Sequence, residues 1–333
     1  MMARAIEANH NAIVQAVELL EAGEVVAFAT ETVYGLGADT LNTQAIEKIY
    51  KLKGRPATVP LTALVLDEKQ AQSLAKTWDE RCAKLVERFW PGPLTIVLDR
   101  SDNVPIQAAA GLDTIAVRSP SHQVARQLLK EFGRSISAPS ANRSGHISPT
   151  SAQHVLDDYK EEDDLLILDG GKCEIGIEST VLDLTTDQPR ILRLGAITPK
   201  QLREVIGDID VPHINEQTNI PGESVKHYSP VTPVDILDRN AINKFLEEAL
   251  SSVVVLCFEA TIVNPPHQAI IMPEFAKQYT AYLYEALRKA DSRGAARIII
   301  ERPKCATGNW EAIVDRLERA ATNANKTQPD AHG

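Results

Sequence analysis

The stretch VVAFATETVYGLGADTLNTQAIEKIYKLKGRPATVP, residues 25–60, decides the fold of the first part of this chain. It begins with an apolar run, Val25–Ala29, which predicts a buried strand. The run is followed by TETVYGLG, in which two glycines allow backbone conformations that other residues resist. We therefore expect a buried strand that ends in hydroxyl-bearing residues.

The same stretch continues with a helix and a cluster of cations. The helix is expected from about Thr43 to Gly54, with Asn42 or Thr43 as its N-cap. The cations near its end are Lys48, Lys51, Lys53 and Arg55. Hydroxyls at a strand end that face Lys-x-Arg-Pro suit a polyanionic ligand such as a nucleotide. Spacing alone leaves a second interpretation open, a solvated basic helix end that compensates the helix dipole.

Strand and helix patterns alternate through the first two hundred residues, which predicts α/β architecture with a mixed sheet. The further strands are expected at Leu61–Leu66, Leu94–Leu98, Thr114–Val117, Ser135–Ala138, Leu165–Leu168 and Val181–Leu184. The further helices are expected at Asn11–Ala22, Trp78–Phe89, His122–Phe132, Ser151–Tyr159 and from Thr198 to about Gly207.

The second half of the chain predicts a linker and a smaller α/β domain. Periodicity is lost over 209–233, where prolines and polar residues are typical of a linker. Strand and helix patterns return over 234–322, without a GxGxxG fingerprint after the first strand, so a dinucleotide site is not expected there. The domains are therefore 1–208, 209–233 and 234–322, and the polar residues 323–333 are predicted to be a disordered tail.

Composition limits the class of protein. The 44 % hydrophobic and 24 % charged content is ordinary for a soluble globular chain of 333 residues, and the longest apolar run, Val253–Phe258, is too short to cross a membrane. A formal net charge of −10 argues against a protein whose main task is to bind a nucleic-acid backbone. Four scattered cysteines indicate neither a zinc site nor a disulfide framework. We expect a cytoplasmic protein.

A series of short motifs extends along most of the chain. Besides TETVYGL and KLKGRP they are FWPGPLT (89–95), AVR (116–118), SAPSANRSG (137–145), SPT (148–150), DGG (169–171), GIEST (176–180), ILR (191–193) and KHYSP (226–230). In order and spacing the series resembles the two-domain YrdC-like threonylcarbamoyl-AMP synthase family. The resemblance implies a YrdC-like mixed twisted sheet with helices, plus a smaller Rossmann-like C-terminal α/β domain.

The activity implied by this resemblance is the reaction of L-threonine, bicarbonate and ATP to threonylcarbamoyl-AMP and pyrophosphate, for threonylcarbamoyladenosine formation in tRNA. Mg²⁺ would accompany ATP, and the product would pass to a TsaD-like threonylcarbamoyl transferase. Direct tRNA contact is a weaker expectation. Such a reaction needs cations and positioning more than a protein nucleophile, and the chain shows no Ser-His-Asp or Cys-His signature.

The site residues follow from the resemblance, motif by motif. Lys53 and Arg55 match the family's phosphate-binding pair and are the expected catalytic cations. The expected ATP contacts are Arg55, Val59, Thr114, Ser140, Asn142, Ser148, Arg193 and Tyr228. The expected threonine contacts are Thr32, Leu64, Arg118, Ala138 and Ser179. No side chain is assigned to a metal, although Glu178 is a candidate for Mg²⁺, and Ser148 is also interpreted as a helix N-cap that precedes a proline.

Alternatives remain at several positions. Arg118 could form a structural salt bridge, and Thr32 or Thr114 could be an ordinary strand threonine. The chain departs from the family pattern at Ala29, Val59, Leu64 and Leu194, where the family usually has Pro, Asn, His and Pro. Val59 and Leu64 remove polar groups that should touch the ligands, which leaves a weakly active paralogue as an alternative. A non-catalytic RNA-binding module is a second alternative, and the segment 221–230, with Tyr228, is expected to be a lid over the nucleotide.

Overall fold

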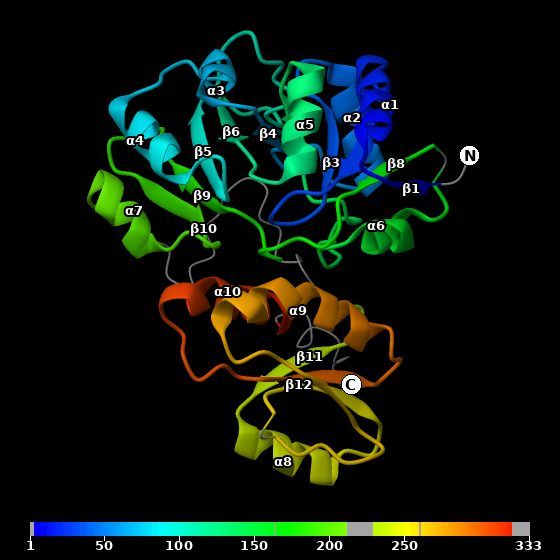
Figure 1. Ribbon diagram of the computed structural model, residues 1–333. Coiled ribbons are helices and arrows are strands. Elements are labelled where there is room, and N and C mark those ends of the chain that lie inside the picture. Colours follow the sequence, from blue (N-terminus) through cyan, green and yellow to red (C-terminus); the bar gives the residue numbers. More distant parts are fainter. Residues whose placement is uncertain (1–2, 163, 212–228, 260, 322–333) are drawn as a thin grey trace, which may run out of the picture. The chain divides into compact units, whose positions relative to one another are not determined.

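The computed structural model describes residues 3–162, 164–211, 229–259 and 261–321 (Figure 1). Along the chain they belong to two compact units. The N-terminal unit takes Met1–Ser144 and Ser148–Glu223, and the C-terminal unit takes Gly145–Ile147 and Ser224–Gly333. Within the described residues, no helix combines the length and the apolar character needed to cross a membrane.

The N-terminal unit is built on a mixed sheet with the strand order β1-β8-β2-β3-β7-β4-β6-β5-β9-β10 among the described residues. Its strands are β1 (Arg4–Glu7), β2 (Val26–Phe28), β3 (Gly35–Asp39), β4 (Thr62–Leu64), β5 (Leu94–Asp99), β6 (Thr114–Arg118), β7 (Ile136–Ser137), β8 (Leu166–Asp169), β9 (Thr180–Asp183) and β10 (Arg190–Arg193). Its helices are α1 (His10–Glu21), α2 (Thr43–Lys53), α3 (Glu68–Leu74), α4 (Glu80–Phe89), α5 (Gln123–Phe132), α6 (Ala152–Tyr159) and α7 (Pro199–Ile206). The predicted mixed sheet is confirmed, whereas β1, β3, β10 and α3 were not predicted.

The helix of the opening stretch forms as its end signals predict. Asn42 is the N-cap of α2, and its side chain accepts from the backbone N–H groups of Gln44 and Ala45. Gly54 ends the helix in the left-handed conformation, with φ 61°. Within the last turn, the Lys53 side chain lies inside the N-terminal unit, because it is only 2 % exposed.

The strand β3 corrects the prediction for the glycine-containing segment. Gly35–Asp39 is completely buried and pairs antiparallel with β2, where Gly37 lies opposite Val26. A Cβ atom on Gly37 would lie 2.5 Å from the Phe28 ring and 2.7 Å from the Ile136 side chain. The glycine is therefore required by close packing between strands, which local sequence patterns do not reveal.

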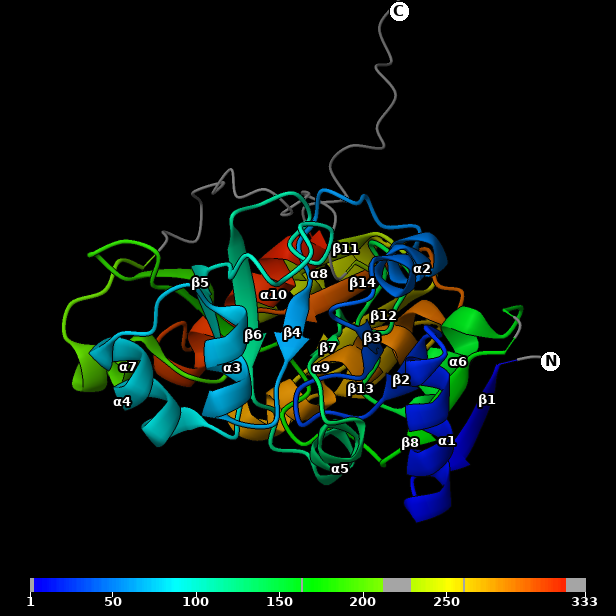
Figure 2. The same cartoon turned by 90° about the horizontal axis from the view of Figure 1, so that it is seen from above.

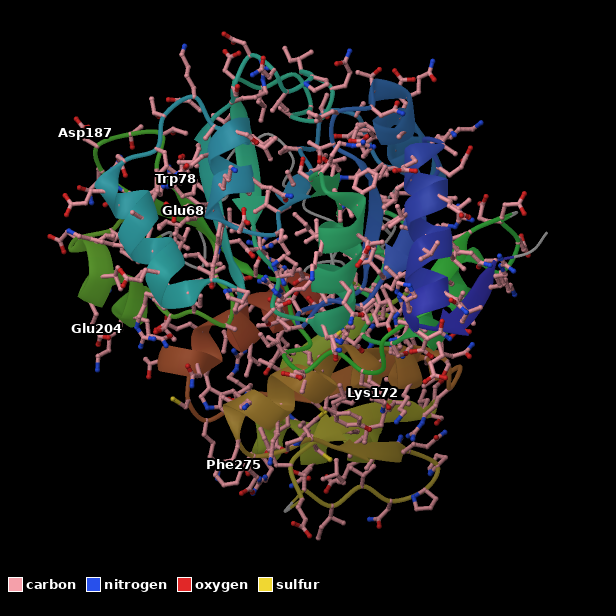
Figure 3. The ribbon with its side chains drawn as sticks, turned by 45° about the horizontal axis from the view of Figure 1, so that its top comes forward. Glu68, Trp78, Lys172, Asp187, Glu204 and Phe275 are labelled. Carbon is pink, nitrogen blue, oxygen red and sulfur yellow. The ribbon has the colours of Figure 1, made fainter. Side chains whose placement is uncertain are left out.

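Helices cover the sheet at both ends. Figures 1 and 2 both place α3, α4 and α7 at the end that carries β5, and α1 at the end that carries β1. Helices α1 and α5 pack against each other over a hydrophobic cluster that includes Ile13, Phe28, Leu64 and Leu128. At the other end, the Trp78 Nε1 donates to Glu68 Oε1 at 2.9 Å (Figure 3) and so ties α3 to the segment before α4.

The C-terminal unit is a small α/β layer structure with parallel strand pairs in the order β11-β14-β12-β13. Its described elements are β11 (Val234–Leu237), α8 (Arg239–Glu248), β12 (Val253–Cys257), β13 (Gln268–Ile271), α9 (Ala276–Asp291), β14 (Arg297–Glu301), a 3₁₀ turn (Gly308–Trp310) and α10 (Glu311–Ala321). Helix α8 covers one face of the sheet, and α9 and α10 cover the opposite face (Figure 1). The predicted Rossmann-like layer arrangement is confirmed.

We predict that Gly37→Ala destabilises the protein by about 1–3 kcal/mol, because the new methyl group overpacks against Phe28 and Ile136. The measurement is the free energy of unfolding in urea. Gly54→Ala is the control, since no atom lies within 4 Å of its added Cβ and only a backbone strain of about 1 kcal/mol is expected. A Gly37→Ala loss no larger than that of the control would contradict the packing explanation.

Candidate active site

The polar segment after β2 is buried and internally bonded. Thr30, Glu31 and Thr32 are each at most 4 % exposed. The Thr30 hydroxyl donates to the Val33 carbonyl at 2.6 Å and lies 2.9 Å from the Thr32 hydroxyl. Hydroxyls at the end of β2 are thus held in fixed positions, and the expected contact of Thr32 with threonine stays a prediction.

Arg118, at the carboxyl end of β6, contacts this segment. Its Nη1 donates to the Thr32 hydroxyl at 2.9 Å, its Nε donates to the Gly92 carbonyl at 3.3 Å, and its Nη2 lies 2.7 Å from Glu31 Oε1. The guanidinium and the Glu31 carboxylate are almost fully buried. Arg118 therefore does form an ion pair, the alternative considered for it, and the pair lies beside Thr32.

This ion pair leaves hydrogen-bonding capacity unused. The 2.7 Å contact between Arg118 and Glu31 is outside hydrogen-bond geometry, so Arg118 Nη2 and both Glu31 carboxylate oxygens lack a hydrogen-bond partner among the described residues. Buried polar groups in folded proteins are nearly always hydrogen-bonded, and an exception calls for a ligand, a water or another explanation. The charges are close enough to stabilise each other, while part of their hydrogen-bonding capacity stays unused among the described residues.

A second set of hydroxyls lies at the start of β9. Ser179 is 2 % exposed, and its hydroxyl lies 2.7 Å from the Thr95 hydroxyl. Arg193 donates from Nη2 to the Ser179 hydroxyl and from Nε to the Ser179 carbonyl, each at 3.0 Å. The structure brings together Ser179 and Arg193, two residues expected to bind threonine and ATP, respectively.

Lys53 lies beneath the SAPSAN segment. Its ammonium donates to the carbonyls of Ser140 and Asn142, each at 2.5 Å. Burial, and next the positive charge of Arg55, hold the pKa of Lys53 well below its ordinary value. The Ser140 hydroxyl donates to Asn142 Oδ1 at 2.5 Å. In this structure the ammonium of Lys53 holds the loop, and its expected role as a catalytic cation stays a prediction.

Arg55 and Val59 lie in the turn after α2. Arg55 donates from Nη2 to the Pro60 carbonyl at 3.2 Å, and Val59 is 7 % exposed. The Val59 carbonyl accepts from the Tyr50 hydroxyl at 2.9 Å, while burial raises the pKa of Tyr50 to about 12. The apolar Val59 side chain is thus packed inside the turn, and its backbone fixes the turn to α2.

Ser148 is placed differently from its expected position as an N-cap. Helix α6 begins later, and its N-cap is Ser151, whose side chain accepts from the His154 N–H. The Ser148 hydroxyl instead donates to Glu178 Oε1 at 2.7 Å, with both residues buried. The N-cap interpretation is wrong because the serine hydroxyl has a carboxylate acceptor from a distant segment. That contact joins SPT to GIEST.

Of the remaining predicted ligand contacts, Leu64 and Thr114 lie near opposite ends of β6. Leu64 lies opposite Arg118 in the pairing of β4 with β6, but it is 3 % exposed and belongs to the hydrophobic cluster under α5. Ala138 is half-buried against the same cluster. Thr114 begins β6, about 13 Å along the strand from Arg118 and on the same face. Only a long ligand such as a nucleotide can span that distance. Tyr228 lies outside the described residues.

Main-chain hydrogen bonds bring the motif segments together. Tyr34 N–H donates to the Pro149 carbonyl, and Leu36 N–H donates to the Pro139 carbonyl, each at 2.9 Å. The N–H groups of Ile175 and Gly176 donate to the carbonyls of Glu31 and Thr32, at 2.8 and 3.1 Å. Segments far apart in sequence therefore form one polar region around the end of β2.

Sequence reasoning missed two residues of this region. Glu31 stands between the two threonines of TETVYGL, and the signal for it was an acid directly after an apolar strand. Thr95 is the last residue of FWPGPLT, whose other residues were interpreted only as a helix stop and a strand. Both residues lie inside motifs on which the resemblance rests, so their place in these motifs was a signal that they belong to the site.

Comparison with known proteins agrees with this geometry. A family profile described as "Telomere recombination" matches residues 18–195, and a profile of the threonylcarbamoyl-AMP synthase C-terminal domain matches residues 197–322. A protein of Bacillus subtilis named threonylcarbamoyl-AMP synthase is 40 % identical over 332 residues, which covers 95 % of this chain and 94 % of the relative. The chain belongs to the threonylcarbamoyl-AMP synthase family.

Other relatives extend the likeness to the whole structure. A Pyrococcus abyssi protein with the same name is 37 % identical over 310 residues, covering 90 % of this chain and 91 % of the relative. The crystal structure of P. abyssi Sua5 complexed with L-threonine matches with a TM-score of 0.88 at 35 % identity, covering 97 % of this chain and 98 % of that one. Family and fold class are therefore as predicted.

We predict that Leu64→His destabilises the protein by about 1–3 kcal/mol, because an imidazole replaces an apolar side chain in the cluster under α5. The measurement is the free energy of unfolding, with Leu64→Met as a volume-matched control. Unchanged stability together with a lower KM for threonine would show that position 64 contacts the ligand, as the family pattern at this position implies.

Proposed function

We propose that this chain synthesises threonylcarbamoyl-AMP from L-threonine, bicarbonate and ATP, in the cytoplasm. The observation that supports it most is the buried Glu31–Arg118 pair, whose unused hydrogen-bonding groups lie beside the Thr32 hydroxyl. A receptor with one fixed cation and one fixed anion is complementary to a zwitterionic amino acid.

Threonine is bound in this proposal through its charged ends. Its carboxylate binds Arg118 Nη2, because a guanidinium offers further N–H groups beyond those given to Thr32 and Gly92. Its ammonium donates to the Glu31 carboxylate, which compensates the charge of Arg118 before the ligand arrives. Ser179 and Ala138 complete the contacts.

ATP occupies the region of Arg193, Ser140 and Asn142, with Arg55 and Lys53 as cations for its phosphates. The threonine ammonium first gives up a proton, for which the Glu31 carboxylate is the adjacent acceptor. The free amine then forms a carbamate with bicarbonate, which releases water. A carbamate oxygen then attacks the α-phosphorus, and pyrophosphate leaves. The protein contributes alignment and positive charge to this step, since no covalent enzyme intermediate is needed.

Mg²⁺ is proposed to arrive with ATP. No cluster of three or more metal-ligating side chains occurs in the part of the chain that the structure describes. The buried Glu178, hydrogen-bonded to Ser148, fits the usual Mg²⁺ arrangement of one or two carboxylates with phosphates and water. When bound, Mg²⁺ neutralises charge on the leaving pyrophosphate.

The product is a mixed anhydride that water hydrolyses, so it must reach its acceptor quickly. We propose that a TsaD-like threonylcarbamoyl transferase takes it for the modification of tRNA. Direct contact of this chain with tRNA is the weaker part of the proposal, because the formal net charge is −10.

The test is pyrophosphate release from ATP and Mg²⁺. Release that needs both L-threonine and bicarbonate supports the proposal. Release without threonine, or none under any condition, contradicts it. Tight tRNA binding without pyrophosphate release would instead favour an RNA-binding module.

We predict that Arg118→Gln raises the KM for threonine more than tenfold, because loss of a buried charged partner costs about 2–5 kcal/mol. Glu31→Gln is expected to act in the same direction, since it removes the anion that compensates Arg118 and binds the ammonium. The measurement is steady-state pyrophosphate release at varied threonine, and Lys84→Gln, which removes a surface charge paired with Glu80, is the control. An unchanged KM in both site variants would overturn the threonine assignment.

A further inference from the structure

A cavity of about 240 Å³ lies within the C-terminal unit. It is lined by Arg239, Phe258, Glu274, Lys304, Cys305 and Trp310. Arg239 follows β11, Phe258 follows β12, Glu274 follows β13, and the others follow β14. All four strands therefore contribute to it with the segments after their carboxyl ends.

The topology makes this edge a place where ligands bind. After β11 the chain enters α8 on one face of the sheet, and after the adjacent β14 it enters α10 on the opposite face (Figure 1). Neighbouring strands whose connections diverge in this way leave a crevice at their carboxyl ends, where α/β sheets bind their ligands. The lack of a GxGxxG fingerprint argues against a dinucleotide site but does not argue against a site for a smaller ligand.

A buried network fixes one cation at the crevice. Glu301, 4 % exposed at the end of β14, accepts from Phe258 N–H at 2.9 Å and from the Thr261 hydroxyl at 2.6 Å. Its other oxygen accepts from Arg239 Nε at 3.0 Å. Arg239 is thus held by its Nε, and all of its hydrogen bonds and ion pairs with described residues use this atom. Such a guanidinium is oriented for forked contact with an oxyanion.

A second cation and an aromatic wall complete the cavity. The exposed Lys304 forms no ion pair with a described residue. Trp310 is half-buried and packs edge-on against Tyr279 at 5.3 Å between ring centroids, and Tyr279 in turn lies 6.1 Å from Phe258. The cavity therefore combines aromatic surface with two cations and the carboxylate of Glu274.

We propose that this cavity binds a nucleoside monophosphate, with the phosphate on Arg239 and Lys304 and the base against Trp310. The volume is below the roughly 300–1,000 Å³ typical of sites for drug-sized ligands, which suits a mononucleotide whose sugar stays at the mouth. The site is separate in sequence from the proposed catalytic residues and is independent of the proposed reaction.

Cys305 supplies a native reporter for the test. It lines the cavity and is exposed, whereas Cys82, Cys173 and Cys257 are buried. Hydrogen bonds with Thr307 lower the pKa of its thiol, which favours the reactive thiolate. The experiment measures the rate at which 5,5′-dithiobis(2-nitrobenzoate) modifies the full-length protein while AMP is varied.

AMP is expected to slow the reaction of Cys305 in a saturable manner, and adenosine or inorganic phosphate alone is expected to protect far less. Lys304→Glu should weaken the protection about tenfold or more. Arg239→Lys keeps the ion pair with Glu301 but removes the fork, and should weaken it as well. Lys244→Glu, an exposed charge reversal on α8 outside the cavity, is the control. In this variant AMP should protect Cys305 as well as it does in the unchanged protein.

AMP bound at the proposed catalytic site is separated from this effect by Arg55→Ala, in which the protection should persist. Unfolding temperatures verify that each variant is folded. A Cys305 rate that AMP does not change, full protection in Lys304→Glu, or protection that disappears in Arg55→Ala would each overturn the proposal.

Discussion

The buried contact between Glu31 and Arg118 is the constraint on which the N-terminal unit depends. Moving two charges out of water costs several kcal/mol per ion, and attraction repays this only where further hydrogen bonds are made. Here Thr32 and Gly92 supply some of those bonds, while Nη2 and both carboxylate oxygens have none among the described residues. The proposed threonine site rests on this unused hydrogen-bonding capacity.

The other motif segments are joined to this region and to one another by hydrogen bonds. The N–H groups of Ile175 and Gly176 donate to the carbonyls of Glu31 and Thr32, and Lys53 holds the SAPSAN loop by two carbonyls. Gly195 shows how closely these segments approach, since a Cβ there would lie 2.3 Å from the Thr180 nitrogen. Each segment satisfies polar groups of another, so a ligand site assembled from loops has fixed geometry.

Much of the fold could be predicted from local chemistry. Helix α2 has the predicted cap at Asn42 and the predicted end at Gly54, because capping is a property of a few adjacent residues. Strand β3 could not be predicted in this way, because Gly37 is required by close contact with Phe28 and Ile136. Both residues belong to other strands, and Ile136 is also distant in sequence. The N-cap interpretation of Ser148 failed for the same reason, since its acceptor is Glu178. In the candidate site, the ligand contacts that the motifs imply for Thr32, Arg118, Ser179 and Arg193 stay predictions, and the ion pair of Glu31 with Arg118 is visible only in the folded structure.

The most direct test of the central claim is a crystal structure of this protein with L-threonine bound. The account predicts the ligand carboxylate within hydrogen-bond distance of Arg118 Nη2, and its ammonium at the Glu31 carboxylate, beside the hydroxyls of Thr32 and Ser179. Threonine located away from Arg118, or an unchanged Glu31–Arg118 pair that makes no contact with the bound ligand, would contradict it.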